Sequence, residues 1–232
     1  MRLAQVLFTQ GFGTRRECEA LIMHGWVEAG GRVCSDPAAD VPLDALMLRV
    51  RGEPWPYYEK ALLLMHKPAG HECSRNPRHH PSVLALLPAP LRRRGVQPIG
   101  RLDADTTGAL LLTDDGALIH RLTSPRQHVP KVYEVGTRHP LDASQVARLL
   151  AGVALVDEPG HPARATACEI EAPHRLRLVL TEGRYHQVKR MIAAVGNRVE
   201  RLHRSAFGTL ALPAGLAPGQ WRWVSDEERA AL

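Results

Sequence analysis

The residues best suited to chemistry lie in one short stretch, GRLDADTTGALLLTDDG, at positions 100–116. Gly100 and Gly108, which permit unusual backbone conformations, bracket Arg101 and Asp103. A carboxylate beside a guanidinium can stay ionised when partly buried, because the opposite charge offsets the desolvation that would otherwise protonate it. Asp103 is therefore a candidate nucleophile or base. An Asp-rich surface turn is the alternative interpretation of the same residues.

The order Asp-Ala-Asp-Thr at 103–106 also resembles the signature of phosphotransferases that use an aspartyl nucleophile and Mg²⁺. In those enzymes the first Asp should end an apolar strand, whereas here the apolar run at 109–113 follows the carboxylates. Arg101 would also compete with Mg²⁺ for them. We rank this interpretation below the first.

A second cluster, EGRYHQVKRMIAAVGNRV at 182–199, has the spacing of a helix with two distinct faces. The apolar positions predict a buried face: Val188, Met191, Ile192 and Val195. The basic positions share another face: His186, Lys189 and Arg190. This basic face could contact phosphate or a catalytic carboxylate, and a solvated charged face is the alternative.

A third feature is Lys131-Val132-Tyr133, within a predicted strand. The period of two places Lys131 and Tyr133 on the same side. An exposed aromatic ring beside a base-binding cleft would serve for stacking, and the alternative for Tyr133 is core filling.

The elements that must position these residues follow a mixed order. Strands are predicted at 26–27, 32–33, 61–65, 109–113, 131–135, 165–171 and 175–182, and helices near 3–7, at 14–24, 117–122, 142–151 and 185–195, the last ended by Gly196. Two prolines and several aromatics at 51–60 indicate a linker. The pattern predicts an α+β protein with a mostly antiparallel mixed sheet and flanking helices, divided into residues 1–50, a linker 51–60 and residues 61–232.

Composition limits the function classes. The chain of 232 residues carries a net charge of +6, and only four of its thirty basic residues are lysine. Arginine binds phosphate and stacks on bases, which fits an RNA partner, although a GC-rich genome produces the same bias. The four cysteines are far apart and the histidines lack ligand spacing, so we expect no metal site. No membrane span or signal peptide is visible, and we expect a cytoplasmic protein.

Together these segments resemble the pseudouridine synthases of the small-ribosomal-subunit type. The resemblance rests on KPAGHECS at 67–74, the stretch 100–116, TSPRQHVPKVYEV at 123–135 and EGRYHQVKRMIAAVGNRVERLHR at 182–204. The first 48 residues resemble an S4 RNA-binding domain, although Arg2-Leu3-Ala4-Gln5 departs from its usual R-L-D-K opening. His66 also stands where the family commonly has Asn.

The resemblance implies the isomerisation of a uridine in ribosomal RNA without a cofactor. It assigns Asp103 as the essential aspartate, Tyr133 as the residue that stacks on the flipped base, and Lys189 as the partner of the aspartate. RNA contacts are expected from Arg15, Arg16, Lys67, Arg101, Arg184, His186, Gln187 and Arg190. We expect a monomer that acts on 16S rRNA or on a small-subunit assembly intermediate. The alternatives are a large-subunit (23S) rRNA synthase and an S4-type protein that binds RNA without modifying it.

Overall fold

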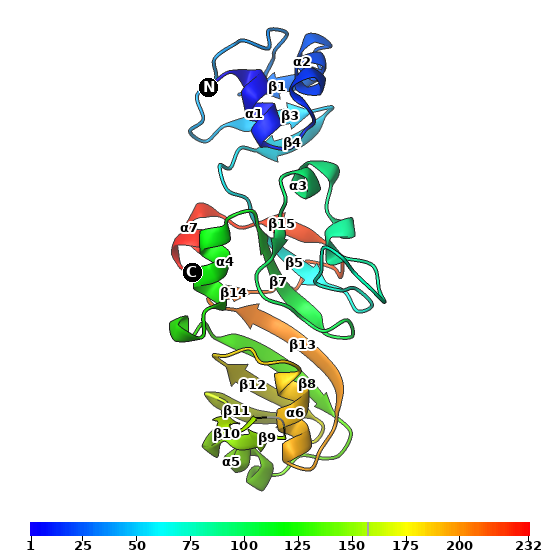
Figure 1. Ribbon diagram of the computed structural model, residues 1–232, viewed down its shortest axis with the longest axis vertical. Helices are drawn as coiled ribbons and strands as arrows, with labels where there is room; N and C mark the ends of the chain where they lie inside the picture. The colour runs from blue at the N-terminus through cyan, green and yellow to red at the C-terminus, as the bar shows by residue number, and fades with distance from the viewer. Residues whose placement is uncertain (157) are drawn as a thin grey trace. The chain divides into compact units, whose positions relative to one another are not determined.

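The computed structural model describes residues 1–156 and 158–232 and divides into two compact units (Figure 1). The first unit combines Met1–Ala61 with Leu87–Val96, and the second combines Leu62–Leu86 with Gln97–Leu232. A segment from within the predicted 61–232 domain therefore belongs to the first unit. None of the described helices is both long and apolar enough to cross a membrane.

The first unit is a small helix and sheet assembly. Its elements are α1 (Leu3–Thr9), α2 (Arg15–Met23), β1 (Val27–Ala29), β2 (Arg32–Val33), β3 (Met47–Val50), β4 (Glu53–Pro56) and α3 (Ala89–Arg93). The sheet has the order β2-β1-β3-β4. As predicted, α2 begins with a capping box, in which Thr14 and Glu17 each bind the backbone N–H of the other.

The predicted linker at 51–60 is wrong for its central residues, because β4 pairs with β3 along Glu53–Pro56. Its two prolines are tolerated because β4 lies at the edge of the sheet. Trp55 is buried, and its indole N–H donates to Gln10 Oε1 at 3.2 Å. This aromatic residue therefore belongs to the core of the first unit.

The segment 87–96 is held to the first unit by Arg94. Its guanidinium donates to Gln10 Oε1 at 2.7 Å and to the carbonyls of Tyr58 and Glu59, each at 3.0 Å. These contacts join residues more than thirty positions apart, a distance that no local sequence pattern reports.

The second unit contains one large sheet with helices packed on it. Its helices are α4 (Gly116–Thr123), α5 (Ala143–Ala151), α6 (Gln187–Ala194) and α7 (Asp226–Ala230), with short 3-10 turns η1 (Val83–Leu86) and η2 (Pro125–Gln127). Its strands are β5 (Leu62–Lys67), β6 (Gln97–Pro98), β7 (Thr107–Thr113), β8 (Lys131–Thr137), β9 (Val153–Leu155), β10 (Glu158–Ala163), β11 (Ala167–Ala172), β12 (Arg175–Leu180), β13 (Val199–Phe207), β14 (Leu210–Ala211) and β15 (Trp221–Trp223).

The prediction of a mostly antiparallel sheet is confirmed. The strand order is β11-β12-β8-β13-β7-β5-β15, and among these described strands β13 and β7 form the parallel pair. At this pair the backbones approach so closely that a Cβ on Gly108 would collide with the Arg204 carbonyl. Gly108 also has a φ of +115°, so the predicted need for glycine here has a physical basis.

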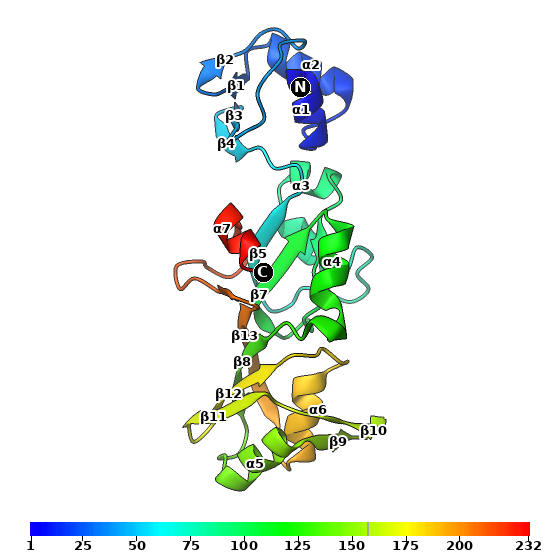
Figure 2. The ribbon, with the colours of Figure 1, turned by 90° about the vertical axis from the view of Figure 1, so that its left-hand side faces the viewer.

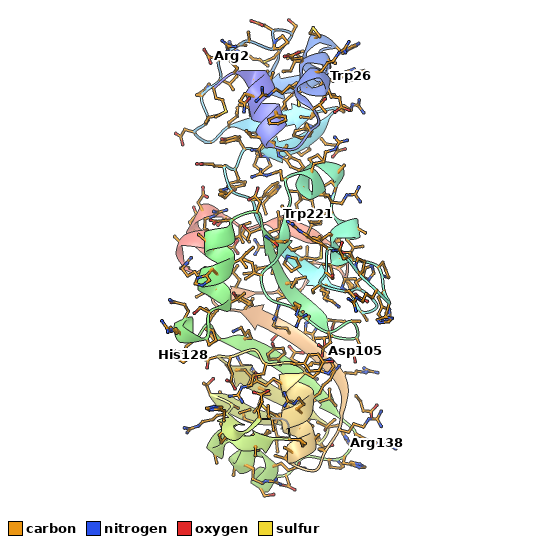
Figure 3. The ribbon with its side chains drawn as sticks, viewed as in Figure 1. Arg2, Trp26, Asp105, His128, Arg138 and Trp221 are labelled. Carbon is orange, nitrogen blue, oxygen red and sulfur yellow. The ribbon has the colours of Figure 1, made fainter. Side chains whose placement is uncertain are left out.

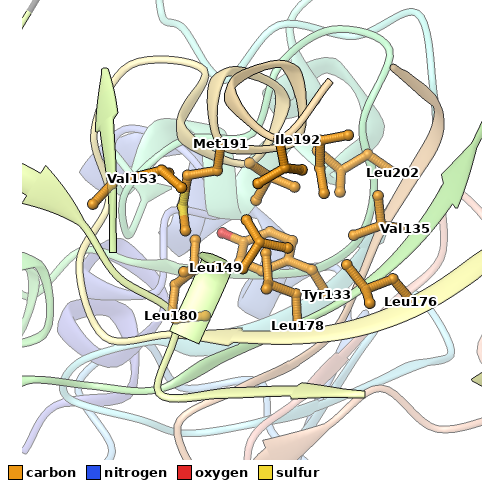
Figure 4. Packing of buried hydrophobic residues seen from close by; sticks show 14 of the residues in the cluster. Tyr133, Val135, Leu149, Val153, Leu176, Leu178, Leu180, Met191, Ile192 and Leu202 are labelled. Atoms are coloured by element: carbon orange, nitrogen blue, oxygen red, sulfur yellow. The ribbon is translucent and has the colours of Figure 1, made fainter. Parts of the chain in front are cut away.

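Helices α4 and α6 lie on the same side of the sheet (Figure 2). The predicted apolar face of α6 is confirmed, since Val188, Met191, Ile192 and Val195 are all buried. They pack with β8 and β12 in a core that also includes Tyr133 and Leu149 (Figure 4). Gly196, with φ +83°, follows the end of this helix as expected.

Helix α6 begins two residues later than predicted, at Gln187. His186 has a left-handed backbone with φ 47° and is the residue just before the first turn of the helix, with no capping hydrogen bond from its side chain. It therefore does not share a helical face with Lys189 and Arg190 as the spacing suggested. The turn directs the His186 side chain independently of the helix.

Candidate active site

Asp103 lies in the loop that joins β6 to β7, and the buried side chain of Lys67 holds this loop in place. The Lys67 side chain is fully buried, and its ammonium donates to the carbonyls of Pro68, Ala104 and Thr106 at 2.9, 3.2 and 2.8 Å. Burial lowers the Lys67 pKa. The prediction that Lys67 contacts RNA is therefore corrected, because its donors bind the backbone of the loop that carries Asp103.

The Asp103 carboxylate is held by two residues of the 182–199 cluster. Lys189 Nζ lies 3.2 Å from Asp103 Oδ2, and His186 Nε2 lies 3.4 Å from Asp103 Oδ1. Lys189 also donates to Asp105 at 2.7 and 2.9 Å. Asp103 keeps 27% of its side chain exposed, against 71% for Asp105, which Figure 3 labels. Asp103 is thus the more enclosed of two carboxylates that share one ammonium.

The contact between Lys189 and Asp105 favours the charged form of both side chains. Burial acts to lower the Lys189 pKa, but the hydrogen bonds to Asp105 and Asp103 outweigh it and raise that pKa. Burial acts to raise the Asp105 pKa, but Lys189 outweighs it and lowers that pKa. The ammonium lies between the two carboxylates, where the phosphotransferase interpretation would require Mg²⁺, so the donor set does not fit that interpretation.

Arg101 does not hold Asp103, which corrects the expectation from their proximity in sequence. Across residues 1–156 and 158–232 no ion pair joins the two side chains, whereas Lys189 and His186 both contact the carboxylate. Arg101 is exposed and lines the same cleft as Asp103. Its guanidinium therefore remains accessible from the cleft.

The cleft around Asp103 has a volume of about 960 Å³. Its walls include Arg101, Asp103, Tyr133, His186 and Arg204. Tyr133 is 8% exposed and packs among Leu178, Met191 and Val135 (Figure 4). Tyr133 therefore fits both interpretations drawn from the sequence, because it packs in the core and also forms part of the cleft wall.

Comparisons with known proteins agree with this geometry. Residues 61–194 match the family described as RNA pseudouridylate synthase, and residues 1–45 match the S4 domain. The chain belongs to the RNA pseudouridylate synthase family. An uncharacterised RNA pseudouridine synthase of Bacillus subtilis is 39% identical over 98% of this synthase and 96% of its own length.

Two further matches extend over most of the synthase. Ribosomal small subunit pseudouridine synthase A of Escherichia coli strain K12 is 43% identical over 73% of this chain and 72% of its own length. A crystal structure of a pseudouridylate synthase has a TM-score of 0.71 at 31% identity, covering 100% of this chain and 99% of that one. The resemblance found in the sequence is thereby confirmed, as is the α+β fold.

Two of the predicted RNA contacts of the synthase are engaged within the protein. Arg184 donates to Glu182 at 3.0 Å and to Glu158 at 3.3 Å, and it is 20% exposed. Arg190 donates to Glu158 at 3.1 Å and to the Tyr185 carbonyl at 3.1 Å. Glu158 of β10 therefore pairs with both arginines, and the expected contact of Arg184 and Arg190 with RNA stays a prediction.

The remaining residues of the second cluster shape the turn before α6. Gln187 is 5% exposed, accepts from the Arg184 N–H at 2.8 Å and donates to Glu182 at 2.6 Å. Tyr185 is 69% exposed, and its ring stacks on His186 at 3.8 Å. Gln187 thus supports the loop, and it lines the cleft together with the stacked Tyr185 and His186.

Arg15 and Arg16 belong to the first unit, where both are exposed at the start of α2. The Arg15 guanidinium lies 5.3 Å from the centre of the Phe8 ring. Sequence reasoning missed a second such pair, Arg51 at 4.7 Å over Trp26. Exposed Phe and Trp residues near arginines were the signal that could have revealed both pairs.

Sequence reasoning also missed Arg204 and Thr106, both buried and both part of the cleft wall. The motif containing Arg204 was recognised, but the period of β13 alone does not show which face of the strand meets the cleft. Within the described part of the chain no group of three or more metal-ligating side chains was found.

Proposed function

We propose that this synthase converts a uridine of 16S ribosomal RNA, in free RNA or in a small-subunit assembly intermediate, to pseudouridine, with Asp103 as its catalytic carboxylate. The observation that carries the proposal is the enclosed Asp103 carboxylate, fixed between Lys189 and His186 in a cleft with Tyr133. The small-subunit substrate is supported by the relatives named for that activity at 42–45% identity.

The reaction is an isomerisation in which atoms and electrons balance within the nucleotide. The N1–C1′ bond breaks with its electron pair going to uracil, the base turns, and C5 bonds to C1′. The C5 proton then leaves and N1 gains a proton. The Asp103 carboxylate starts this sequence in one of two ways. It attacks C1′ and forms an ester bond that breaks when C5 bonds to C1′, or it takes the C2′ proton and returns it to C2′ when C5 bonds to C1′. Both routes need a carboxylate close to the ribose.

The uridine must leave its stack before its ribose reaches Asp103, at a cost of a few kcal/mol. Arg101 is exposed on the cleft wall, where its planar guanidinium can take the place of the extruded nucleotide. Tyr133 offers the flipped base an aromatic surface that packing already holds in place. His186, beside Asp103, supplies a further polar contact to the nucleotide.

In this proposal the first unit, which includes the S4 domain, binds RNA and does not contact the reacting base. Arg15 and Arg16 are exposed at the N-terminus of α2, where cationic side chains can contact phosphates. These contacts add affinity without taking part in the chemistry.

The assay is tritium release from RNA labelled at uridine C5, run beside a filter-binding titration. Asp103→Asn should abolish release while the Kd for RNA stays within about threefold. Asp105→Asn is the matched control, since it removes the more exposed carboxylate on the same ammonium, and it should keep at least about a tenth of the rate. Near-normal release by Asp103→Asn would remove Asp103 from the mechanism.

The choice of ribosomal RNA needs a separate measurement. Pseudouridine is mapped in the 16S and 23S RNAs of strains with and without the gene. We expect one site to disappear from 16S RNA and to return when the wild-type gene is restored, but not with Asp103→Asn. Loss of a 23S site instead would establish the large-subunit alternative.

A further inference from the structure

Arg204 occupies an unusual position for a charged residue. It is 2% exposed, and on the sheet it stands opposite Tyr133 of β8 and Gly108 of β7. Its Nε donates to the Ala109 carbonyl at 2.8 Å. Its Nη2 is buried and has no hydrogen-bond partner among the described residues.

Thr106, on the loop that carries Asp103, also has a buried polar atom without a hydrogen-bond partner among the described residues. Its side chain is 1% exposed, and its Oγ1 also has no partner in the part of the chain that the structure describes. Both Thr106 and Arg204 line the cleft. A buried donor without an acceptor destabilises the protein, more so when it is charged, so these groups are suited to a ligand that supplies an acceptor.

A second cation lines the same part of the cleft. Lys131 Nζ lies 5.6 Å from the centre of the Phe207 ring, and the Arg204 guanidinium lies 5.2 Å from it. Burial, followed by the charge of Arg204, lowers the Lys131 pKa to about 8. The carboxylate that acts on Lys131 is Glu182, which already accepts from Arg184 and Gln187.

The geometry points to an oxyanion pocket in which Arg204, Lys131 and Thr106 bind the carbonyl oxygens of the flipped uracil and stabilise its charge as the glycosidic bond breaks. This inference rests on the proposed function and adds residues to the reaction that the sequence did not assign. The electron pair released from C1′ spreads over N1 and the uracil oxygens, so fixed cations at those oxygens lower the barrier.

Burial favours the base over a phosphate as the occupant. Arg204 and Thr106 are almost completely buried, whereas phosphates of a bound strand remain at the mouth of a cleft, where exposed cations such as Arg101 can meet them. The register pairs Arg204 with Tyr133, whose ring is proposed to stack on the base, and both residues line the cleft.

Lys131→Met tests the pocket, because Lys131 is only half-buried and no hydrogen bond of its side chain to another described residue is lost. At saturating enzyme the single-turnover rate of tritium release should fall about 100-fold, while the Kd for RNA stays within about twofold. Lys131→Arg should restore most of the rate. Lys60→Met, which removes the same charge from an exposed site in the first unit, is the matched control and should leave the single-turnover rate unchanged.

The pH profile gives a readout that a purely structural role would not change. Below about pH 8 Lys131 is charged and the single-turnover rate should be at its plateau; the rate should fall as the pH rises through about 8. Lys131→Arg should keep its plateau above pH 9, because arginine remains charged there. The other charged groups that act on Lys131 are Arg204 and Glu182.

The outcomes separate this inference from its competitors. A weaker Kd for RNA with a smaller salt dependence and an unchanged saturating rate would place a phosphate at Lys131 and overturn the pocket. A rate within threefold of wild type in Lys131→Met, folded by thermal melting, would also overturn it. If Lys131→Met unfolds, the pH profiles of wild type and Lys131→Arg decide alone. Failure of the proposed function would appear separately, as no tritium release by wild type.

Discussion

Both units of the synthase carry prominent cations, but they use them differently. In the first unit, Arg15 and Arg51 lie over Phe8 and Trp26, rings that are 39% and 47% exposed. Figure 3 labels Trp26. In the second unit, Lys67 binds three carbonyls and Lys189 binds two carboxylates. These two arginines of the first unit are exposed to solvent, whereas these two lysines of the second unit hold other parts of the protein in place.

This difference shows that the location of a cation, rather than the net charge of its unit, decides whether it can contact RNA phosphate. Residues 1–60 contain seven basic and eight acidic residues, yet they present two arginine–aromatic pairs at the surface. A guanidinium on an exposed ring keeps donors free for phosphate. A buried ammonium bound to carbonyls has none left to offer. The mutations below should change catalysis in the second unit and affinity in the first.

The largest effect is expected from Lys189→Met. Asp103 and Asp105 would lose their shared cation, and the single-turnover rate should fall by a factor on the order of 10²–10³. The Kd for RNA should change less than about threefold, as measured by filter binding. Lys189→Arg keeps the charge and should recover to within about tenfold of wild type. A Lys189→Met rate close to wild type would show that this cation of the second unit is not needed for catalysis.

Lys67→Met should cost stability as well as rate. Three backbone carbonyls would lose an ammonium donor, and the free energy of unfolding of the second unit should fall by roughly 3 kcal/mol, since hydrogen bonds to charged groups are worth about 1.5–3 kcal/mol. Hydrogen exchange is the measurement: amides at 102–107 should exchange faster, and those of α1 and α2 should not. Equal acceleration in both units would contradict the local role of Lys67.

Arg51→Ala and Arg15→Ala should change affinity alone. Each should raise the Kd for RNA by about 3- to 10-fold and reduce the slope of log K against log salt by about 1, as expected for one lost phosphate contact. The single-turnover rate at saturating enzyme should stay within twofold. The matched control is Arg49→Ala, an exposed arginine of the same unit whose guanidinium lies near Glu28 rather than over an aromatic ring. A slower saturating rate in Arg15→Ala would show that the first unit takes part in the chemistry.

The smallest effect is expected from Arg190→Met. This side chain pairs with Glu158 and with the Tyr185 carbonyl, so the Kd for RNA should remain within about twofold. The cost should appear in thermal melting instead, at about 1 kcal/mol for a partly exposed ion pair. A clear loss of RNA affinity would restore the sequence-based expectation for Arg190.

The sequence predicted the parts of the site that depend on short spacing. The glycines around Asp103, the apolar period of α6 and the capping box at Thr14 are local features, and local patterns report them well. The link between Asp103 and Lys189 came from the family resemblance, and the structure places the two side chains in contact.

What the sequence could not predict depends on distant partners. Glu158 accepts hydrogen bonds from Arg184 and Arg190, which lie 26 and 32 positions away in the sequence. Both arginines therefore stabilise the contact between β10 and the region of α6. Arg94 donates a hydrogen bond to Gln10, 84 positions away in the sequence, and this contact holds the segment of Arg94 to the first unit. Period alone assigns a residue to a face but not to burial, so Lys67 and Arg204 could not be recognised as buried cations.

The insertion of β13 between β8 and β7 also sets the order of events during protein synthesis. Strands β7 and β8 leave the ribosome well before β13, and until Phe207 has been made they lack the neighbour that brings Tyr133 and the Asp103 loop together. A polypeptide that still lacks β13 therefore cannot form a working cleft, and the synthase becomes active only after this strand has been made.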